Sequence, residues 1–481
     1  MAQMTATPVS TQNFLLDGKW LGDGETLEVH SPYDGTVVGR VFQGRRAHAE
    51  AAIAAAVKAF GTTRRLPAFE RQRVLRHVAH TIAERKEQFA QTIAQEAGKP
   101  IKAARTEVDR AIFTFTVAAE ESTRIAGEYL PLDWQEFTVG RWGIVRRFPV
   151  GPVAGITPFN FPLNLVAHKI APSIATGCPM VLKPASQTPL TALLLAEAVQ
   201  QAGWPDGALN VLPLSNEDAG LLVSDDRLKL ISFTGSAAVG WGIKQRSGKK
   251  KVLLELGGNA GVIVHGDADL DFAASRCVAG GFTYAGQSCI SVQRILVESS
   301  AFGKFTELLL AGVARLRTGD PLDEATDLGP MIRESDAVRA VQWVEEAVRS
   351  GARLLCGGRR NGSLMEPTVL TGTRPEMKVN CQEIFAPVVT VEAYDNFEEA
   401  LRQVNNSPYG LQAGVFTRDV KRLFTAFEEL EVGGLIAGDV PTFRIDNMPY
   451  GGVKDSGLGR EGLRYAIEEM TEPRLLVMNV R

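Results

Sequence analysis

The chain has 481 residues, about three times the usual size of one domain, so two or three domains are expected. Hydrophobic residues make up 45% and charged residues 22%, which excludes a wholly disordered or fibrous chain. The 52 Lys and Arg against 55 Asp and Glu give a formal net charge of -3 with no basic block, so nucleic acid is not an expected partner.

The sequence also argues against a membrane protein or a secreted one. Its longest apolar stretches, such as residues 149–157, are far shorter than the roughly 20 residues that a membrane helix needs. Residues 1–13 lack the basic-then-apolar order of a secretion signal. The five cysteines form no CxxC pair and the histidines form no HExxH motif. We therefore predict a soluble cytoplasmic protein with free thiols and no bound metal.

The N-terminal part shows the apolar spacing of helices. We expect helices over 46–60, 68–96 and 102–127. β-forming residues around Gly140 then predict a hairpin over 132–150. Because such a hairpin can project from the body of a protein, we expect it to serve association.

Short apolar runs alternate with helices in the rest of the chain. In the first series, helices are expected to begin near residues 163, 190 and 237. In the second series, helices are expected near 300–316, 335–351 and 397–405. Alternation of this kind predicts parallel βαβ units with helices on both faces of each sheet. The expected fold class is α/β, with two doubly wound parallel-sheet domains.

Two glycine-rich segments differ in how well their context supports a cofactor site. Residues 457–462 read GLGREG and match GxGxxG, but no βαβ unit follows, so we interpret them as a turn. Residues 233–240 read FTGSAAVG and lie between an expected strand and a helix. There Gly235 permits close backbone approach, Ser236 offers a hydroxyl, and the helix N-terminus offers N–H groups to a diphosphate. The alternative is a strand-to-helix turn without a ligand.

Two further segments begin where strands are expected to end, which is where parallel sheets bind ligands. They are ITPFNFP at 156–162 and VLKPAS at 181–186. The ammonium of Lys183 could bond the hydroxyls of a ribose. The alternative for each segment is a polar strand end with no ligand.

A carboxylate and a thiol complete the candidate chemistry. Glu255 lies inside an apolar strand, where burial raises the pKa of a carboxyl and suits it to general-base work. Cys289 lies among small residues in YAGQSCIS, which leave room for a substrate carbonyl. A lone cysteine is otherwise a small buried apolar residue, a description that suits Cys178, Cys277 and Cys356. We therefore predict that Cys289 is a nucleophile and Glu255 a base.

These segments occur in an order that resembles the aldehyde dehydrogenase superfamily. The match covers roughly 150–465 in seven blocks: ITPFNFP, VLKPASQTP, FTGSAAVG, LLELGGNA, GQSCI, EIFAPV and MPYGGVKDSGLGREG. Cys289 follows Glu255 by 34 residues, as in that superfamily. FRIDNMPYGG and AGQSCISVQRILV look most similar to a subgroup of archaeal lactaldehyde and non-phosphorylating glyceraldehyde-3-phosphate dehydrogenases and phosphonoacetaldehyde dehydrogenase. The resemblance implies NAD(P)-dependent oxidation of an aldehyde to its acid.

The resemblance implies a role for each catalytic residue. Cys289 would attack the aldehyde to give a thiohemiacetal, whose oxyanion the Asn160 amide and the Cys289 backbone N–H would stabilise. After hydride transfer, Glu255 would activate the water that hydrolyses the thioester.

It also implies a set of cofactor-binding residues: Thr157, Pro158, Lys183, Ser186, Gly235, Ser236, Val239, Glu383 and Phe385. Lys183 and Glu383 would hold the two riboses, Ser236 would contact the diphosphate, and Phe385 would back the nicotinamide ribose. Relatives that prefer NAD commonly carry Glu where this chain has Ser186. Because a carboxylate there repels a 2′-phosphate, we predict that NADP is accepted at least as well as NAD.

The expected substrate is a short aldehyde with an anionic or hydroxylated tail, such as glyceraldehyde 3-phosphate, lactaldehyde or a semialdehyde. Arg110 and Arg444 match positions at which relatives with phosphate or carboxylate substrates carry Arg, and two guanidinium groups could hold an anion. The alternative is that Arg110 pairs with Glu107 and Arg444 with Asp446 as surface ion pairs. Against a phosphate, Ser288 stands where those relatives have a third Arg, and Phe161 replaces a tyrosine.

The resemblance also assigns domains. The NAD(P)-binding domain would comprise 1–129 and 149–254, the catalytic domain 255–465, and an oligomerisation element 130–148 and 466–481. A homodimer or homotetramer is therefore expected. Two other functions stay open at this point: a cysteine-dependent hydrolase or acyltransferase without a redox step, and an inactive structural relative.

Overall fold

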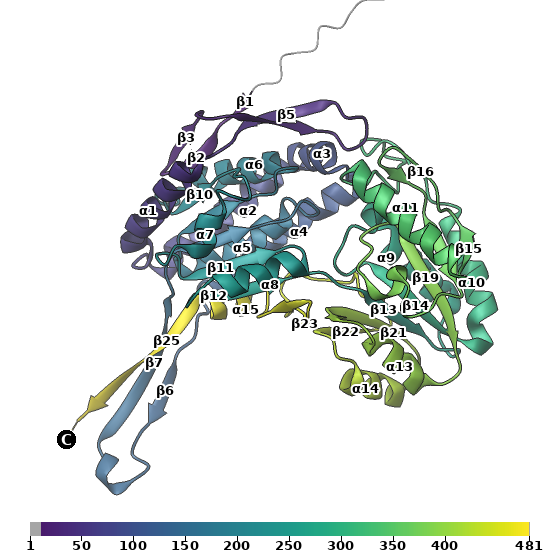
Figure 1. Cartoon of the computed structure of the whole chain (residues 1–481). Coiled ribbons are helices and arrows are strands. Elements are labelled where there is room, and N and C mark those ends of the chain that lie inside the picture. Colours follow the sequence, from purple (N-terminus) through teal and green to yellow (C-terminus); the bar gives the residue numbers. More distant parts are fainter. Residues whose placement is uncertain (1–10, 481) are drawn as a thin grey trace, which may run out of the picture.

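The computed structural model describes residues 11–480, which form two α/β bodies and a projecting β-arm (Figure 1). Within these residues the first body has an eight-stranded sheet. Its strands, in spatial order, are β24 (Gly457–Leu458), β12 (Lys251–Glu255), β11 (Leu230–Thr234), β8 (Val153–Ile156), β9 (Met180–Lys183), β10 (Leu209–Val211), β2 (Phe14–Leu16) and β3 (Lys19–Leu21). The strands from β12 to β10 are parallel, whereas β24 and β2 run antiparallel to their neighbours.

Helices cover both faces of this sheet. One layer contains α2 (Ala68–Glu84), α3 (Lys86–Ala97), α4 (Ile101–Glu121), α5 (Asn164–Thr176), α6 (Pro189–Gln201) and α15 (Leu463–Glu469). The other contains α1 (Arg46–Thr63), α7 (Gly220–Ser224) and α8 (Ala237–Arg246). The helix predicted over 68–96 is in fact two, because Arg85 leaves the helical conformation with φ -103° and ψ 21°.

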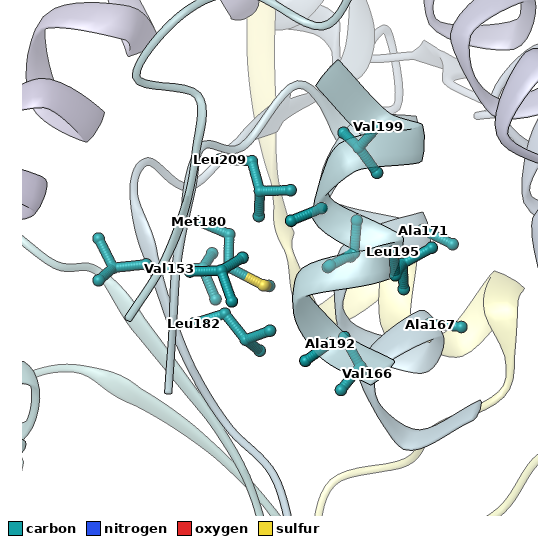
Figure 2. Close-up of a cluster of buried hydrophobic side chains, with 14 of the residues drawn as sticks. Val153, Val166, Ala167, Ala171, Met180, Leu182, Ala192, Leu195, Val199 and Leu209 are labelled. Carbon is teal, nitrogen blue, oxygen red and sulfur yellow. The ribbon is translucent and has the colours of Figure 1, made fainter. Parts of the chain in front are cut away.

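The core of the first body is packed from aliphatic side chains of short strands and helices. Figure 2 shows Val153, Met180, Leu182 and Leu209 of the sheet facing Leu195 and neighbouring residues of α5 and α6. Even α5 is buried along its whole length. Burial on all sides explains why these segments read as continuous apolar runs, as buried parallel strands and core helices do.

The second body has a seven-stranded sheet within the described residues. Its order is β15 (Arg353–Cys356), β18 (Thr368–Thr371), β19 (Val388–Tyr394), β14 (Val292–Glu298), β13 (Ala260–Val264), β21 (Gln412–Phe416) and β22 (Gly434–Ala437). Its helices are α9 (Leu270–Phe282), α10 (Ser299–Val313), α11 (Glu334–Arg349), α12 (Lys378–Cys381), α13 (Phe397–Asn405) and α14 (Val420–Glu429). All but β15 are parallel to their neighbours, so the predicted α/β class with two doubly wound sheets is confirmed.

The arm is a three-stranded antiparallel sheet. β7 (Arg141–Pro149) lies between β6 (Glu128–Pro131) and β25 (Thr471–Asn479), and the three project away from both bodies (Figure 1). The predicted hairpin is therefore present, but its first strand ends at Pro131, just before the residues in which we expected it to begin. A smaller sheet joins β1 (Thr11–Gln12), β5 (Val37–Phe42) and β4 (Thr26–His30).

The division into domains stays a prediction, and sheet membership favours moving two of its boundaries. Glu255 is the last residue of β12 and so belongs to the first sheet, not to the second body. The segment that carries β24 and α15 returns to the first body, although we assigned residues up to 465 to the catalytic domain. In the described part of the chain no helix has the length and apolar character needed to cross a bilayer.

Candidate active site

A cavity of about 670 Å³ is lined by residues of both bodies. It brings together eleven of the sixteen predicted site residues: Arg110, Pro158, Asn160, Phe161, Gly235, Ser236, Ser288, Cys289, Glu383, Phe385 and Arg444. Thr157, Lys183, Ser186, Val239 and Glu255 are not part of its lining. The sequence motifs thus converge on one place in the fold.

Seven of the nine predicted cofactor residues lie at or just beyond the carboxyl ends of parallel strands in the first sheet, whereas Glu383 and Phe385 come from the second body. Thr157 follows β8 and donates its backbone N–H to the carbonyl of Lys183, the last residue of β9 (3.2 Å). Ser236 follows β11 by two residues and is the N-cap residue of α8. The exposed Val239 lies one turn into that helix. Ligands of parallel α/β sheets bind at this edge.

Two features of the site fit a dinucleotide. Burial lowers the pKa of Lys183, whose ammonium makes no hydrogen bond or ion pair with any of residues 11–480. Glu383 approaches the glycine turn after β12 closely: its Oε1 accepts the Gly258 N–H (2.9 Å), and a Cβ at Gly257 would lie 2.3 Å from its other oxygen. Burial raises the pKa of Glu383 to about 7. The unpaired ammonium of Lys183 and the carboxyl of Glu383, which lies against the glycine turn, are suited to hydrogen bonding with ribose hydroxyls.

Cys289 lies in a tightly turned loop between α9 and β14. Tyr284 and Ala285 have φ of 51° and 53°, a left-handed conformation that non-glycine residues rarely adopt. Gly286 is also left-handed, and a Cβ there would fall 2.2 Å from the Ala386 carbonyl oxygen. Burial raises the pKa of the Cys289 thiol to about 11, and its Sγ lies 3.1 Å from the Tyr450 hydroxyl.

The amide of Asn160 is tied to the same loop. Its Nδ2 donates to the carbonyl of Gln287, two residues before the thiol (3.0 Å). The amide retains a second hydrogen, and Asn160 lines the cavity beside Cys289. The side chain is therefore placed to donate to an oxygen held near Sγ.

Glu255 is close enough to act electrostatically on the Cys289 thiol but is not part of the cavity lining. Its Oε2 is buried without a hydrogen-bond partner among the described residues. A Cβ at Gly451 would lie 2.7 Å from the Gly459 carbonyl oxygen and 3.0 Å from Glu255 Oε1, so a side chain there would crowd the carboxyl. Burial, and then the charge of Glu461, raise the pKa of Glu255 well above its usual value. A raised pKa is what general-base work near neutral pH requires.

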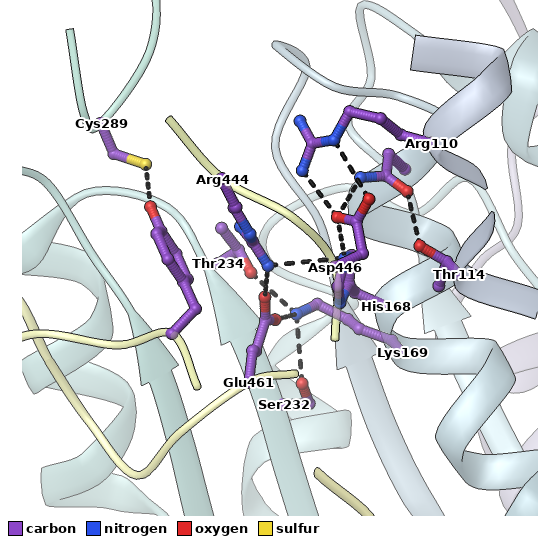
Figure 3. A network of polar contacts seen from close by, with 12 residues as sticks. Arg110, Thr114, His168, Lys169, Ser232, Thr234, Cys289, Arg444, Asp446 and Glu461 are labelled. Atoms are coloured by element: carbon purple, nitrogen blue, oxygen red, sulfur yellow. Dashed lines mark hydrogen bonds and ion pairs between the residues drawn. The ribbon is translucent and has the colours of Figure 1, made fainter. Parts of the chain in front are cut away.

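A buried network of charges includes two residues of the cavity lining, Arg110 and Arg444 (Figure 3). Asp446 accepts from Arg110 through both oxygens (2.7 and 3.2 Å) and from Asn164 (3.1 Å), and its Oδ1 is 2.8 Å from His168 Nε2. The alternative in which Arg110 pairs with Glu107 does not hold, because Arg110 pairs with Asp446 and Glu107 is buried against Lys99.

Glu461 forms the second half of this network. Its Oε2 accepts from Arg444 (3.1 Å) and its Oε1 from Lys169 (3.3 Å), which also donates to Thr234 (2.7 Å). Although burial opposes it, Lys169, His168 and Arg444 hold the pKa of Glu461 at about 2. The alternative in which Arg444 forms a surface pair with Asp446 does not hold, because its guanidinium pairs with Glu461 and its side chain is buried.

Sequence reasoning gave no role to four residues of this region, Glu461, His168, Lys169 and Tyr450, and it named Asp446 only as a surface partner of Arg444. Glu461 lies in the GLGREG segment that we interpreted as a turn. The segment is indeed turned, since β24 ends at Leu458 and the backbone of Glu461 pairs with that of Tyr450. His168 and Lys169 interrupt an otherwise apolar helix, and charged residues inside a buried helix signal a buried partner.

The floor of the cavity contains a second buried pair. Lys99 and Glu107 are bonded to each other, and the Lys99 ammonium lies over the rings of Phe161 (3.8 Å) and Tyr284 (4.5 Å). Glu107 also accepts the N–H groups of Leu163 and Asn164 at the start of α5 (2.9 and 3.1 Å). The pair fixes Phe161 and the start of α5 close to Asn160. No cluster of His, Cys, Asp and Glu side chains suited to a metal ion occurs in residues 11–480.

A family model described as the aldehyde dehydrogenase family matches residues 20–476. The chain belongs to the aldehyde dehydrogenase family. The match begins well before residue 150, where the sequence motifs start, so it includes the N-terminal helices and strands. A 3-sulfolactaldehyde dehydrogenase of Priestia megaterium is 44% identical over 98% of this chain and 99% of its own length.

Two solved aldehyde dehydrogenase structures are similar over nearly the whole chain. Aldehyde dehydrogenase 21 of Physcomitrella patens, in complex with the reaction product succinate, is 48% identical with a TM-score of 0.97 and covers 98% of this chain and 99% of its own. The glyceraldehyde-3-phosphate dehydrogenase GapN of Methanocaldococcus jannaschii, complexed with NADP, is 41% identical with a TM-score of 0.92 and covers 95% and 100%. The chain is an NAD(P)-dependent aldehyde dehydrogenase.

Proposed function

We propose that this enzyme oxidises a short aldehyde with an anionic tail and that Cys289, Asn160 and Glu255 carry the reaction. The single observation behind the catalytic roles is the meeting of the Cys289 thiol and the Asn160 amide in one cavity, with the buried carboxyl of Glu255 close enough to act on the thiol. In the first step the ionised Sγ of Cys289 adds to the aldehyde carbon. The oxygen that becomes negative is held by the free hydrogen of the Asn160 amide.

The second half of the reaction releases the acid. A nicotinamide bound in the cavity would supply the acceptor for the hydride of the aldehyde carbon, and loss of that hydride converts the Cys289 thiohemiacetal to a thioester. Glu255 then takes a proton from water, the hydroxide adds to the thioester carbon, and the Cys289 thiolate leaves. One aldehyde, one oxidised cofactor and one water give one acid, one reduced cofactor and one proton.

The unpaired ammonium of Lys183 and the carboxyl of Glu383 would hold the two riboses of the cofactor. The Ser236 hydroxyl would contact the diphosphate at the start of α8, while Phe385 would back the nicotinamide ribose. Gly235, Pro158, Thr157 and Val239 complete that side of the site. Ser186 stands near Lys183 without a carboxylate, so a 2′-phosphate meets a cation and no like charge. We therefore propose that NADP is used at least as well as NAD.

The anionic tail follows from the charges of the buried network. Arg110, Arg444 and Lys169 are cations, and Asp446 and Glu461 are anions. Burial lowers the pKa of His168 and raises that of Glu255, which favours the neutral form of both groups before the water is activated. One positive charge is thus left over, and Nε of the buried Arg444, which lines the cavity, has no partner in the described structure. A sulfonate, carboxylate or phosphate would balance that charge, whereas Ser288 and Phe161 add no further cation.

A panel of aldehydes tests this proposal. The purified protein is mixed with NADP or NAD, and the absorbance of the reduced nicotinamide is followed with sulfolactaldehyde, succinic semialdehyde, glyceraldehyde 3-phosphate, lactaldehyde and propanal. We expect kcat/KM to be highest for an anionic aldehyde. Equal values for lactaldehyde and the anionic aldehydes would contradict the tail preference. Hydrolysis of an ester or thioester without any aldehyde oxidation would favour a cysteine hydrolase. The absence of any activity would favour an inactive relative.

The exposed apolar residues of the arm support a homo-oligomer. Leu475, Leu476 and Val477 of β25 are each about half exposed, as is Val139, and Trp134 at the arm's tip is 86% exposed. Single chains rarely leave so many large apolar side chains in water on one element. We propose that the arm docks onto a second copy of the chain, in a dimer or tetramer, and that the enzyme works in the cytoplasm.

A further inference from the structure

Tyr450 reaches the reacting sulfur from a segment to which the sequence assigned no role. Its hydroxyl lies 3.1 Å from Cys289 Sγ, a normal hydrogen-bond distance to sulfur, and its side chain lines the cavity. In the neutral thiol either group can be the donor. Once the thiol has ionised, only the phenol has a hydrogen to donate.

The position of this ring is fixed from three directions. The backbone of Tyr450 forms a two-way bridge with Glu461: the Tyr450 N–H donates at 3.0 Å and the Glu461 N–H donates at 2.6 Å. Glu461 holds Arg444, and the Arg444 guanidinium lies 3.6 Å from the centre of the Tyr450 ring. Ile290 and Leu411 pack in the same apolar cluster. The hydroxyl therefore has little freedom to leave the sulfur.

The stacked cation also strengthens the phenol as a donor. A positive charge over the ring face withdraws electron density from the hydroxyl, and the buried location keeps water from competing for the hydrogen. Burial raises the pKa of Tyr450 well above its usual value, which favours the protonated phenol. Tyr450 is thus suited to donate a hydrogen and not to act as a base.

We propose that Tyr450 is a further catalytic residue, which donates its phenolic hydrogen to the thiolate of Cys289 and fixes Sγ for attack. The inference builds on the proposed role of Cys289 as the nucleophile. Burial and the carboxyls of Glu383 and Glu255 disfavour the thiolate, whereas the Tyr450 hydrogen bond and the charge of Arg444 favour it.

The test compares Tyr450→Phe with the unchanged enzyme and with Tyr394→Phe. The phenylalanine ring would still stack on Arg444, so only the hydroxyl is lost. Tyr394 is a matched control, since its hydroxyl also makes one hydrogen bond, to His265 (3.0 Å), but lies outside the cavity. The rate of alkylation of Cys289 by iodoacetamide is measured against pH, with the modified residue located by mass spectrometry.

We expect the apparent pKa of the Cys289 thiol to rise by about one unit in Tyr450→Phe and to stay unchanged in Tyr394→Phe. The thiolate absorbance near 240 nm, taken as a difference from Cys289→Ala, gives a second and independent titration. An unchanged thiol pKa in a Tyr450→Phe protein that melts at the wild-type temperature would overturn the proposal. Neither measurement contains aldehyde or cofactor, so failure of the dehydrogenase assignment would appear separately, as a lack of turnover.

Discussion

Cys289 and Cys381 differ in their surroundings. Cys289 lines the cavity beside Asn160, whereas Cys381 ends α12, lies outside the cavity and contacts the Glu376 carbonyl (3.5 Å). We expect Cys289→Ala to abolish aldehyde oxidation and Cys381→Ser to keep most of it. Steady-state rates with a saturating aldehyde decide between them, and a Cys381→Ser enzyme as inactive as Cys289→Ala would contradict the assignment of the nucleophile.

Glu255 is expected to govern the release of the acid. Because its pKa is raised, the fraction of ionised base grows as the pH rises through that pKa, so deacylation speeds up with pH and slows as pH falls. Glu255→Gln removes this dependence and slows turnover, yet leaves a rapid burst of reduced cofactor in stopped-flow traces. A Glu255→Gln enzyme with the wild-type steady-state rate at neutral pH would be incompatible with a base at this position.

Ser186, at a position where a carboxylate would repel the 2′-phosphate of NADP, allows a test of the preference between NADP and NAD. Ser186→Glu places a negative charge near Lys183 and is expected to lower kcat/KM for NADP at least about tenfold while NADH formation persists, since like charges brought together cost several kcal/mol. Ser186→Gln, which is similar in size and uncharged, is the control. In the unchanged enzyme, an efficiency with NAD tenfold or more above that with NADP would refute the preference itself.

The anion grip is tested by the ratio of kcat/KM for an anionic aldehyde over propanal. Arg110→Leu and Arg444→Leu should each lower this ratio by roughly tenfold or more, as expected for the loss of a charge-assisted hydrogen bond. Arg105→Leu is the matched control for Arg110→Leu, since both residues belong to α4 and Arg105 pairs with Glu87 and Glu324 outside the cavity. Ratios that stay unchanged in both variants would mean that neither Arg110 nor Arg444 binds the tail.

At the scale of elements, α3 and α6 are joined by a carboxyl that no motif predicts. Glu96 is fully buried and accepts the N–H groups of Leu190 and Thr191 at the start of α6 (2.8 and 3.0 Å). Glu96→Ala leaves both donors unpaired and is expected to lower the free energy of unfolding by about 2 kcal/mol, whereas the exposed neighbour Gln95→Ala should change it little. Urea denaturation of both variants measures the difference.

The same carboxyl gives a dependence on pH whose sign is defined. Burial raises the pKa of Glu96 from 4.5 to about 8, so the folded protein binds this proton more tightly than the unfolded one. Stability from this group is complete below the unfolded pKa and is lost as pH rises through the folded one. The free energy of unfolding of the wild type should therefore fall relative to that of Glu96→Gln as the pH rises from 4.5 to about 8. If the two proteins showed the same dependence of stability on pH, the raised pKa of Glu96 would be contradicted.

Elements were predicted well where periodicity and turn residues agree, and poorly where tertiary contacts decide. The helix over Phe397–Asn405 was placed to the residue because an Asn cap and a strong apolar face mark it. The break at Arg85 leaves the apolar spacing intact and had no local signal. In the site, Cys289, Asn160 and the ends of the strands were found from motifs. The ion-pair partners of Arg110 and Arg444 could not be found from spacing, because Asp446 lies 336 residues from Arg110 and Glu461 lies 17 residues from Arg444.

At the scale of the molecule, the arm is expected to set the assembly. Leu476→Asp places a charge in the middle of the exposed apolar strand β25 and should shift the protein to a smaller species in light scattering. Val348→Asp, at a similarly exposed apolar residue of α11, is the control. A wild-type protein that is monomeric at micromolar concentration would remove the basis of this proposal.

The return of the C-terminal segment to the first body has a consequence for the order of synthesis. Lys169 is buried in α5, yet its counter-charge, Glu461, is made almost three hundred residues later. The edge strand β24 and the packing helix α15 arrive with it. A nascent chain that has emerged only as far as the second sheet would have to bury a lone ammonium to complete the first, so the first body reaches its final form only after nearly the whole chain has left the ribosome.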